Sequence, residues 1–255
     1  MRAQSLSTRT INERLGTVTR FESESADIET ATHLDVALWL GNLDVSATSR
    51  ATYHGHLKAC FEWLKIVDLR TDSPMDKVPK PRRPRCTPRP VDSSAIPKIL
   101  KACSRKRTRM MVLLATFAGL RVHEIAKVRA EDFDLTTGSL YVDGKGGVRA
   151  MIPVHHMIAA ELVHFPREGY LFPGSDSGHV LSNSVSMLIG RAMKRAGVAG
   201  TAHQLRHWYG TSLLESGTDV RVVQELMRHV SIQSTTIYTR VSDTMRRDAI
   251  DRLAA

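Results

Sequence analysis

Apolar and polar positions in the first part of the chain alternate with the period of helices. One apolar series has the three- to four-residue spacing of a helix face: Ile11, Leu15 and Val18. A second follows the positions i, i+4, i+7, i+8 and i+11: Tyr53, Leu57, Cys60, Phe61 and Leu64. Between them, residues 33–43 (HLDVALWLGNL) have the pattern of a short helix. We therefore expect a small helical bundle, with Trp39 and Trp63 in its core rather than on a base-stacking surface.

The second part of the chain contains one strongly apolar helix and one hairpin. Residues 108–120 (TRMMVLLATFAGL) predict a buried central helix that Gly119 ends. Before it, residues 93–102 (SSAIPKILKA) predict a helix with a serine cap and an early proline. After it, residues 138–154 (GSLYVDGKGGVRAMIPV) contain two β-favouring runs around a glycine-rich turn, which indicates a hairpin with Lys145 at its tip.

The rest of the pattern returns to helix. The predicted helices cover residues 155–165, 182–197, 203–217 and 219–229, and a last short helix, capped by Ser234, carries Tyr238. The predicted fold class is mainly α, with a small antiparallel sheet or hairpin. Its expected divisions are a helical domain over residues 1–76, a linker over 77–92 and a mostly helical domain over 93–255.

The linker region concentrates the net positive charge of the chain, which suggests a binding partner. Residues 77–92 carry five of the ten prolines, which favours an extended boundary between domains. The formal net charge is +10, and the segment from Lys77 to Arg109 alone carries twelve basic residues and one acid. Such a run is either a solvated basic linker or a strap that follows DNA phosphates. Its position between two structured parts favours the strap, with these candidate DNA contacts: Lys80, Arg82, Arg83, Arg85 and Arg89.

Composition also indicates the cellular compartment. The three cysteines, Cys60, Cys86 and Cys103, form neither a disulfide framework nor a metal-ligand spacing, which fits a reducing compartment. The first residues lack the apolar core of a signal peptide, and the longest apolar run is too short to span a membrane. We expect a cytoplasmic, nucleoid-associated protein with no membrane partner.

A cluster of histidines and arginines then suggests chemistry. Residues 201–217 (TAHQLRHWYGTSLLESG) place His203 and His207 four positions apart, on one helix face, as in zinc hydrolases with an HExxH motif. That motif requires a glutamate where this chain has Gln204. A zinc site is therefore the weaker interpretation, and we expect no metal or other cofactor.

Several motifs resemble one family in order and spacing. They are GLRVHEI at 119–125, GKGG at 144–147, HQLRH at 203–207, LMRH at 226–229 and STTIYT at 234–239. Together they are similar to the catalytic motifs of tyrosine recombinases, the phage integrase family, across the whole second domain. The helical first part resembles that family's core-binding domain less specifically, because small helical bundles are common.

The resemblance implies roles for individual residues. Arg121 and Arg206 would hold the non-bridging phosphate oxygens, a bidentate contact that suits arginine better than lysine. His203 would add a donor, Lys145 would protonate the leaving 5′ oxygen, and Tyr238 would attack phosphorus to form a 3′-phosphotyrosine.

Three further histidine and glutamate positions have implied supporting roles. His229 would contact a phosphate oxygen or orient the nucleophile, Glu124 would pair with Arg121, and His207 would support the site indirectly. Taken singly, each residue also has an ordinary structural explanation, such as a helix start for Arg121 or a turn for Lys145.

Two positions depart from the family pattern. Many members have glycine where this chain has Arg228, so the loop before His229 is bulkier or contacts DNA itself. A second tyrosine, Tyr209, follows Arg206 by three residues, and we interpret it as a packing residue rather than a nucleophile.

The sequence thus predicts a site-specific recombinase that integrates or excises a phage or mobile element. The alternatives are a chromosome- or plasmid-resolving recombinase, a type IB topoisomerase-like enzyme and a catalytically silent DNA-binding regulator. The expected partner is double-stranded DNA with specific attachment sites. The resemblance implies a homotetramer on DNA that associates weakly in solution, through residues 242–255, and an accessory DNA-bending or directionality factor is possible in this family. The target sequence is not readable from a basic linker.

Overall fold

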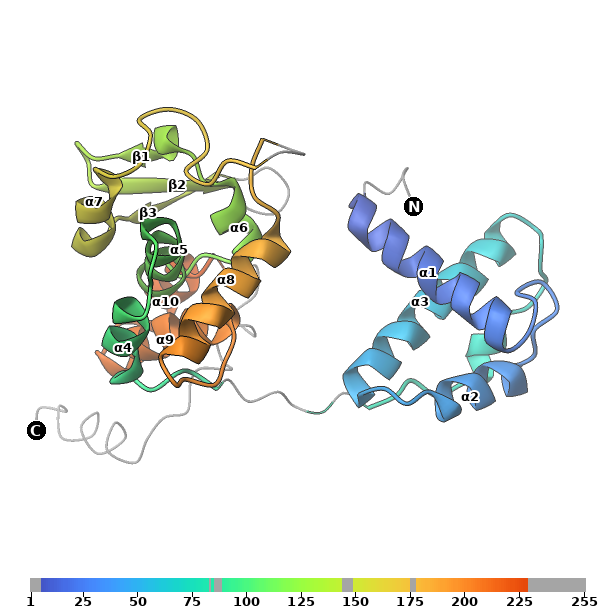
Figure 1. The fold of residues 1–255 in the computed structure, drawn as a ribbon. Coiled ribbons are helices and arrows are strands. Elements are labelled where there is room, and N and C mark those ends of the chain that lie inside the picture. The colour runs from blue at the N-terminus through green and yellow to red at the C-terminus, as the bar shows by residue number, and fades with distance from the viewer. Residues whose placement is uncertain (1–5, 83, 85–88, 144–148, 175–177, 229–255) are drawn as a thin grey trace, which may run out of the picture. The chain divides into compact units, whose positions relative to one another are not determined.

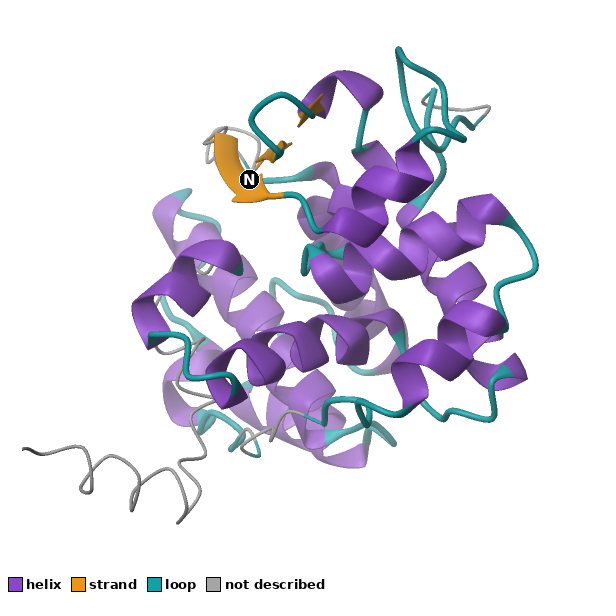
Figure 2. Cartoon of the chain, turned by 90° about the vertical axis from the view of Figure 1, so that its left-hand side faces the viewer, coloured by secondary structure: helices purple, strands orange, loops and turns teal. Residues whose placement is uncertain are grey.

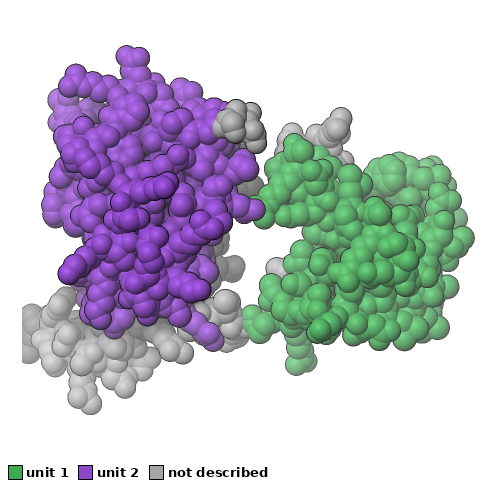
Figure 3. Space-filling model, in the orientation of Figure 1, with its two compact units in different colours: residues 1–86 green, residues 87–255 purple. Residues whose placement is uncertain are grey.

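The computed structural model describes residues 6–82, 84, 89–143, 149–174 and 178–228. The chain forms two compact units, Met1–Cys86 and Thr87–Ala255 (Figure 3). Each unit has its own hydrophobic core, so each is described by itself.

The first unit is a helical bundle. Its elements are α1 (Thr8–Glu24), α2 (His33–Asn42), α3 (Ala47–Ile66) and the short 3₁₀ helix η2 (Pro74–Lys77). Each α-helix starts where a hydroxyl accepts a hydrogen bond from the first turn, and these caps are Ser7, Thr32 and Ser46. The helices enclose Phe21, Trp39, Leu57 and Phe61, all at most 5% exposed. The predicted bundle is therefore confirmed.

The predicted placement of Trp63 in this core is wrong, because its side chain is 53% exposed. Trp63 follows the fully buried Phe61 by two positions, which turns it about 200° around α3, away from the core. Trp39 is buried as expected, and its ring meets Phe21 edge to face at 5.3 Å.

The proline-rich segment is anchored at both ends. Val78 is buried in the first core, where its carbonyl oxygen lies 3.1 Å from His54 Nε2, and Val91 is buried in the second core. The described residues between them have no regular secondary structure. Among the candidate DNA contacts of this segment, Lys80, Arg82 and Arg89 are exposed, whereas Arg83 and Arg85 lie outside the described residues.

The second unit is mostly helical with one small sheet, which confirms the predicted fold class (Figures 1 and 2). Its helices are α4 (Ala95–Lys101), α5 (Lys106–Phe117), α6 (Val122–Lys127), η3 (Ala130–Asp132), α7 (His156–Leu162), α8 (Ser182–Arg195), α9 (Ala202–Glu215) and α10 (Val220–Leu226). Its strands are β1 (Phe133–Asp134), β2 (Ser139–Asp143) and β3 (Arg149–Pro153).

Helix α5 is the centre of this unit, as its sequence predicts. Its residues from Met110 to Ala115 are all fully buried, and the helix packs against α7, α8 and α9. Gly119 ends the apolar run with φ +58°, a conformation that glycine adopts without a steric penalty. A Cβ at this position would also lie 2.5 Å from Tyr209 Cδ1, so both the backbone and the neighbouring ring require glycine.

The sheet is antiparallel in the order β1-β2-β3. Leu140 pairs with Ile152, and both point into the core, which fixes the register of the hairpin. The hairpin is confirmed, although its connection, residues 144–148 with Lys145, lies outside the described residues. The sequence pattern did not reveal β1, because a strand of two residues has no detectable alternation.

The predicted serine cap of α4 is wrong. Ser94 occupies the capping position, but its backbone is already helical and its side chain accepts no hydrogen bond from the helix. Instead, the amide and hydroxyl of Ser94 donate to Asp92 Oδ1 at 2.8 and 2.5 Å. Asp92 therefore shapes the turn that leads into the helix.

Candidate active site

The candidate site is built around the start of α6. Arg121 is the residue before its first turn, and Glu124 follows three positions later. Glu124 Oε2 accepts a hydrogen bond from the Arg121 amide at 2.7 Å, and its Oε1 accepts one from Arg121 Nη1 at 2.9 Å. The same carboxylate thus caps the helix and orients the arginine, whose side chain is 36% exposed.

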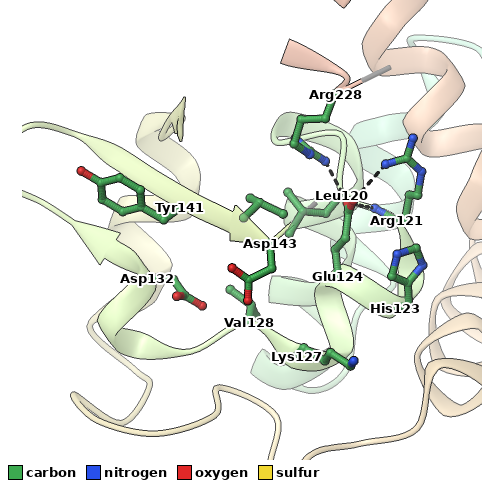
Figure 4. Close-up of a pocket in the computed structure, with 11 residues that line it drawn as sticks. Leu120, Arg121, His123, Glu124, Lys127, Val128, Asp132, Tyr141, Asp143 and Arg228 are labelled. Atoms are coloured by element: carbon green, nitrogen blue, oxygen red, sulfur yellow. Dashed lines mark hydrogen bonds and ion pairs between the residues drawn. The ribbon is translucent and has the colours of Figure 1, made fainter. Parts of the chain in front are cut away.

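A second arginine, 104 positions further along the chain, also contacts this carboxylate. Arg228 lies two residues after Leu226, the last residue of α10, and its Nη2 donates to Glu124 Oε2 at 2.8 Å (Figure 4). The same Nη2 also donates to the carbonyl oxygen of Gly119 at 3.3 Å, and Nη1 donates to the carbonyl oxygen of Leu226 at 3.0 Å. The Arg228 side chain is only 5% exposed, so in this structure it braces the fold rather than facing outward toward DNA.

The backbone at Arg228 has φ +52°, in the left-handed region. A non-glycine residue there is destabilised by roughly 1–2 kcal/mol. This explains why glycine suits the position and why Arg228 must gain stability from its side-chain contacts.

Arg206, on α9, is buried next to the loop that precedes α6 and is only 2% exposed. Its Nη1 donates to the Gly119 carbonyl oxygen, and its Nη2 donates to the Met227 carbonyl oxygen at 2.5 Å. Arg206 therefore joins the loop before α6 to the end of α10. Of the two arginines predicted to clamp a phosphate, Arg121 is the one that reaches the surface.

The two histidines of α9 lie against each other. The ring centroids of His203 and His207 are 4.1 Å apart, and the angle between the ring planes is 70°. Partial burial and the charge of Arg206 lower the pKa of His203, and burial together with His203 and Arg206 lowers the pKa of His207 to about 4. His207 is therefore neutral at pH 7, with one N–H as a donor.

Glu124 is ionised despite its burial. Burial alone would raise the pKa of its carboxyl group, but the charge of Arg228, the hydrogen bond from the Arg121 amide and the charges of Arg121 and Arg206 together lower it. The carboxylate is thus a fixed negative charge among three cations.

A pocket of about 500 Å³ opens beside this cluster. Arg121, His123 and Lys127 lie on its α6 side, and Asp132 and Asp143 lie on the side of the sheet (Figure 4). The pocket thus borders both the proposed clamp arginine and the strand β2 that leads toward Lys145.

Tyr209 is a packing residue in this structure. Its ring fills the space above Gly119 and joins a small cluster with Val223 and Met227. Burial raises the pKa of its hydroxyl, which makes the phenolate harder to form.

Three of the candidate catalytic residues are not described. Lys145, His229 and Tyr238 lie outside the described residues, so the structure brings together Arg121, Glu124, Arg206 and the two histidines of α9 only. The resemblance that identified these residues did not reveal the role of Arg228.

Neither a metal site nor a membrane span is found in the described ranges. No three His, Cys, Asp or Glu residues there are grouped in a way that could hold a metal ion. The helices of this part are also too short or too polar for any of them to cross a bilayer.

Comparison with known proteins identifies the family of this chain. The model of the phage integrase family matches residues 90–245. The tyrosine recombinase XerA of Pyrococcus horikoshii is 30% identical over 86% of this chain and 79% of its own. A solved integrase from mycobacterium phage Brujita is 47% identical and covers 99% of this chain and 88% of its own, with a TM-score of 0.57.

A solved lambda integrase tetramer bound to a Holliday junction shares the fold, with a TM-score of 0.76. It is 19% identical over 90% of this chain and 74% of its own. The fold and these relatives define an enzyme that exchanges DNA strands. The chain belongs to the phage integrase family.

Proposed function

We propose that this protein is a site-specific integrase that inserts or excises the DNA of a phage or mobile element. The observation that carries the proposal is the 47% identity, over nearly the whole chain, to an integrase from a mycobacterium phage. The cluster around Arg121 supports it, because a clamp arginine oriented by a buried carboxylate suits a phosphate under attack.

In the proposed reaction, the Tyr238 oxygen attacks the scissile phosphorus and forms a 3′-phosphotyrosine ester, while the proton of its hydroxyl is released to solvent. The bond from phosphorus to the 5′ oxygen breaks, and Lys145 gives that oxygen a proton. Arg121, Arg206 and His203 stabilise the extra negative charge, with His229 as a further donor or as the residue that orients the tyrosine. The ester conserves the bond energy, so the reverse attack by another strand's 5′ hydroxyl rejoins DNA without ATP, metal or another cofactor.

The proposed partner is double-stranded DNA bound by the two units and the segment between them. In this proposal the exposed residues Lys80, Arg82 and Arg89 contact phosphates. We extend the same role to Arg83 and Arg85, which lie outside the described residues. Lambda integrase has been solved as a tetramer on a Holliday junction, and we extend that assembly to this chain. The protomers would associate weakly without DNA and be linked through residues 242–255, with an accessory bending or directionality factor in addition.

A covalent-trapping assay tests this function. Nicked duplexes from the DNA that flanks this protein's gene are incubated with the protein in EDTA, denatured in SDS and sequenced wherever DNA stays attached to protein. We expect an adduct with the wild type and with Tyr209→Phe, a control that removes the hydroxyl of the tyrosine on α9. Tyr238→Phe should form none. An adduct that survives in Tyr238→Phe, or that needs a metal, would contradict the mechanism.

A second candidate role is the resolution of chromosome or plasmid multimers, which the similarity to XerA favours. The two roles differ in the DNA sites that recombine. An integrase joins two different sites, whereas a resolving enzyme recombines two copies of one site. Recombination between plasmid-borne copies of the recovered site, with no reaction between unlike sites, would favour resolution.

A further inference from the structure

The buried arginine after α10 offers an inference beyond the family motifs. Arg228 contacts three separate segments: the loop at Gly119, the carboxylate of Glu124 on α6 and the end of α10 at Leu226. Each contact is made by an Nη atom of a side chain that is 5% exposed. A planar guanidinium can satisfy several acceptors at fixed angles, which a lysine ammonium cannot reproduce.

These contacts converge on the residue that orients Arg121. Glu124 holds the Arg121 amide with Oε2 and its guanidinium with Oε1, while Arg228 binds the same Oε2. Because Arg228 fixes Oε2, it limits rotation of the carboxylate and hence the direction of Arg121 Nη1. The next residue in the sequence is the candidate catalytic residue His229, which lies outside the described residues.

Arg206 makes a different link between the same segments. It shares the Gly119 carbonyl oxygen with Arg228 and binds the carbonyl oxygen of Met227, so it ties the loop to α10 through main-chain oxygens. The Glu124 carboxylate itself forms ion pairs with Arg121 and with Arg228. Arg228 thus connects the end of α10 to the carboxylate directly.

We propose that Arg228 is a positioning residue for DNA cleavage, which holds Glu124 and, through it, the guanidinium of Arg121 in line with the scissile phosphate. The inference rests on the proposed function, because it assigns Arg121 to that phosphate. The charge of Arg228 also acts on Glu124, as do the charges of Arg121, just before α6, and of Arg206 on α9. The charge of Glu124 in turn acts on the neighbouring His123. Without Arg228, Glu124 should become protonated at a higher pH.

The test compares Arg228→Gly, Arg228→Lys and wild type on the nicked duplex from which wild type forms its adduct. Single-turnover cleavage and DNA affinity are measured from about pH 4 to about pH 9, a range that includes the ordinary pKa values of glutamate, about 4.3, and histidine, about 6.5. Arg109→Lys serves as a matched control, because Arg109 pairs with Glu161 at 3.1 Å in the same unit, away from the candidate site.

We expect Arg228→Gly to fold, since glycine relieves the left-handed backbone, and to bind DNA with nearly wild-type affinity. Its cleavage rate should fall by about tenfold or more, as small displacements of a reacting group commonly cause. The acid limb of its rate profile should move to higher pH. Arg228→Lys should be intermediate in rate with a smaller shift, and Arg109→Lys should match wild type.

Other results separate the two proposals. If wild type cleaves and Arg228→Gly cleaves equally fast with the same pH profile, the positioning role is overturned and the proposed function stands. If Arg228→Gly does not fold, Arg228→Lys decides, and a wild-type rate and profile for that variant overturn the role. If wild type forms no adduct on any fragment, the proposed function fails, and the positioning role fails with it.

Discussion

The most informative perturbation is Glu124→Gln, because it removes one negative charge and changes the shape of the side chain very little. The Glu124 side chain is 3% exposed and accepts hydrogen bonds from the Arg121 amide, Arg121 Nη1 and Arg228 Nη2. A glutamine retains one acceptor oxygen but presents an NH₂ group to at least one of these donors. Because glutamine is neutral, it also leaves both Arg121 and Arg228 without their counterion.

The two arginines do not contribute equally to the expected loss of stability. Arg121 is 36% exposed and can turn toward water, so its share is small. Arg228 is 5% exposed and has no such route. Removing one partner of a buried pair costs about 3–5 kcal/mol, and the retained acceptor places the expected loss at the lower end, about 3 kcal/mol. For a unit of this size that corresponds to a fall in Tm of about 6–12 °C.

Tryptophan fluorescence can isolate the unit in which this loss occurs. Trp208 is the one tryptophan of the second unit, so a Trp39→Phe, Trp63→Phe background reports unfolding of that unit alone. Circular dichroism checks that the background is folded. Glu161→Gln is the matched control, because it makes the same change in the pair with Arg109, which is 33% exposed, and should cost less than about 1 kcal/mol.

The reasoning is refuted if Glu124→Gln loses no more stability than Glu161→Gln. A double-mutant cycle gives an independent check. In the Arg228→Gly background, Glu124→Gln leaves no buried arginine at position 228 without a counterion. The free energy of unfolding lost through Glu124→Gln should therefore be much smaller in that background. An undiminished cost would mean that the pair with Arg228 contributes nothing.

Three further outcomes follow from described residues. Gly119→Ala should lower the free energy of unfolding by about 2–5 kcal/mol in urea denaturation, because it combines a left-handed backbone with a Cβ 2.5 Å from Tyr209 Cδ1; an unchanged midpoint would contradict this close approach of the Tyr209 ring. Stability should fall as the pH drops from 6.5 toward 4, because the pKa of His207 is lowered to about 4 and the unfolded chain therefore binds more protons in that interval. His207→Gln should flatten this decline in Tm, although His203, whose pKa is also lowered, will preserve part of it. Leu113→Ala should cost about 2–5 kcal/mol by the same denaturation, because Leu113 is fully buried in α5, and a loss below about 1 kcal/mol would show that the cavity collapses.

Periodicity was a sound guide to elements that bury a continuous face. The apolar run of α5 predicted a buried central helix, and the two β-favouring runs around a glycine-rich turn predicted the hairpin that pairs Leu140 with Ile152. Both signals are local, because every residue that carries them lies in the element itself. The same reasoning failed for Trp63, where aromatic character was taken as evidence of burial although the residue's angular position on α3 places it outside the stripe.

The site was only partly predictable for a different reason. The family motifs identified Arg121, Glu124 and Arg206, and the structure places them around one loop. The contact between Glu124 and Arg228 joins residues 104 positions apart, and neither residue's neighbours carry a pattern that indicates it. The sequence marked Arg228 as a departure from the family, but its partner could be found only after α6 and α10 had been placed together.

The pairing of Arg228 with Glu124 also constrains how this loop can change by mutation. Losing the arginine first gives glycine on a backbone that favours it, with the carboxylate still compensated by Arg121. Losing the glutamate first leaves the Arg228 guanidinium, which is 5% exposed, without its counterion. That intermediate is the less stable of the two. The two replacements therefore have a preferred order, and a gain of this arginine is accessible only to a chain that already carries the acid. Epistasis of this kind would let positions far apart in the sequence change as a pair.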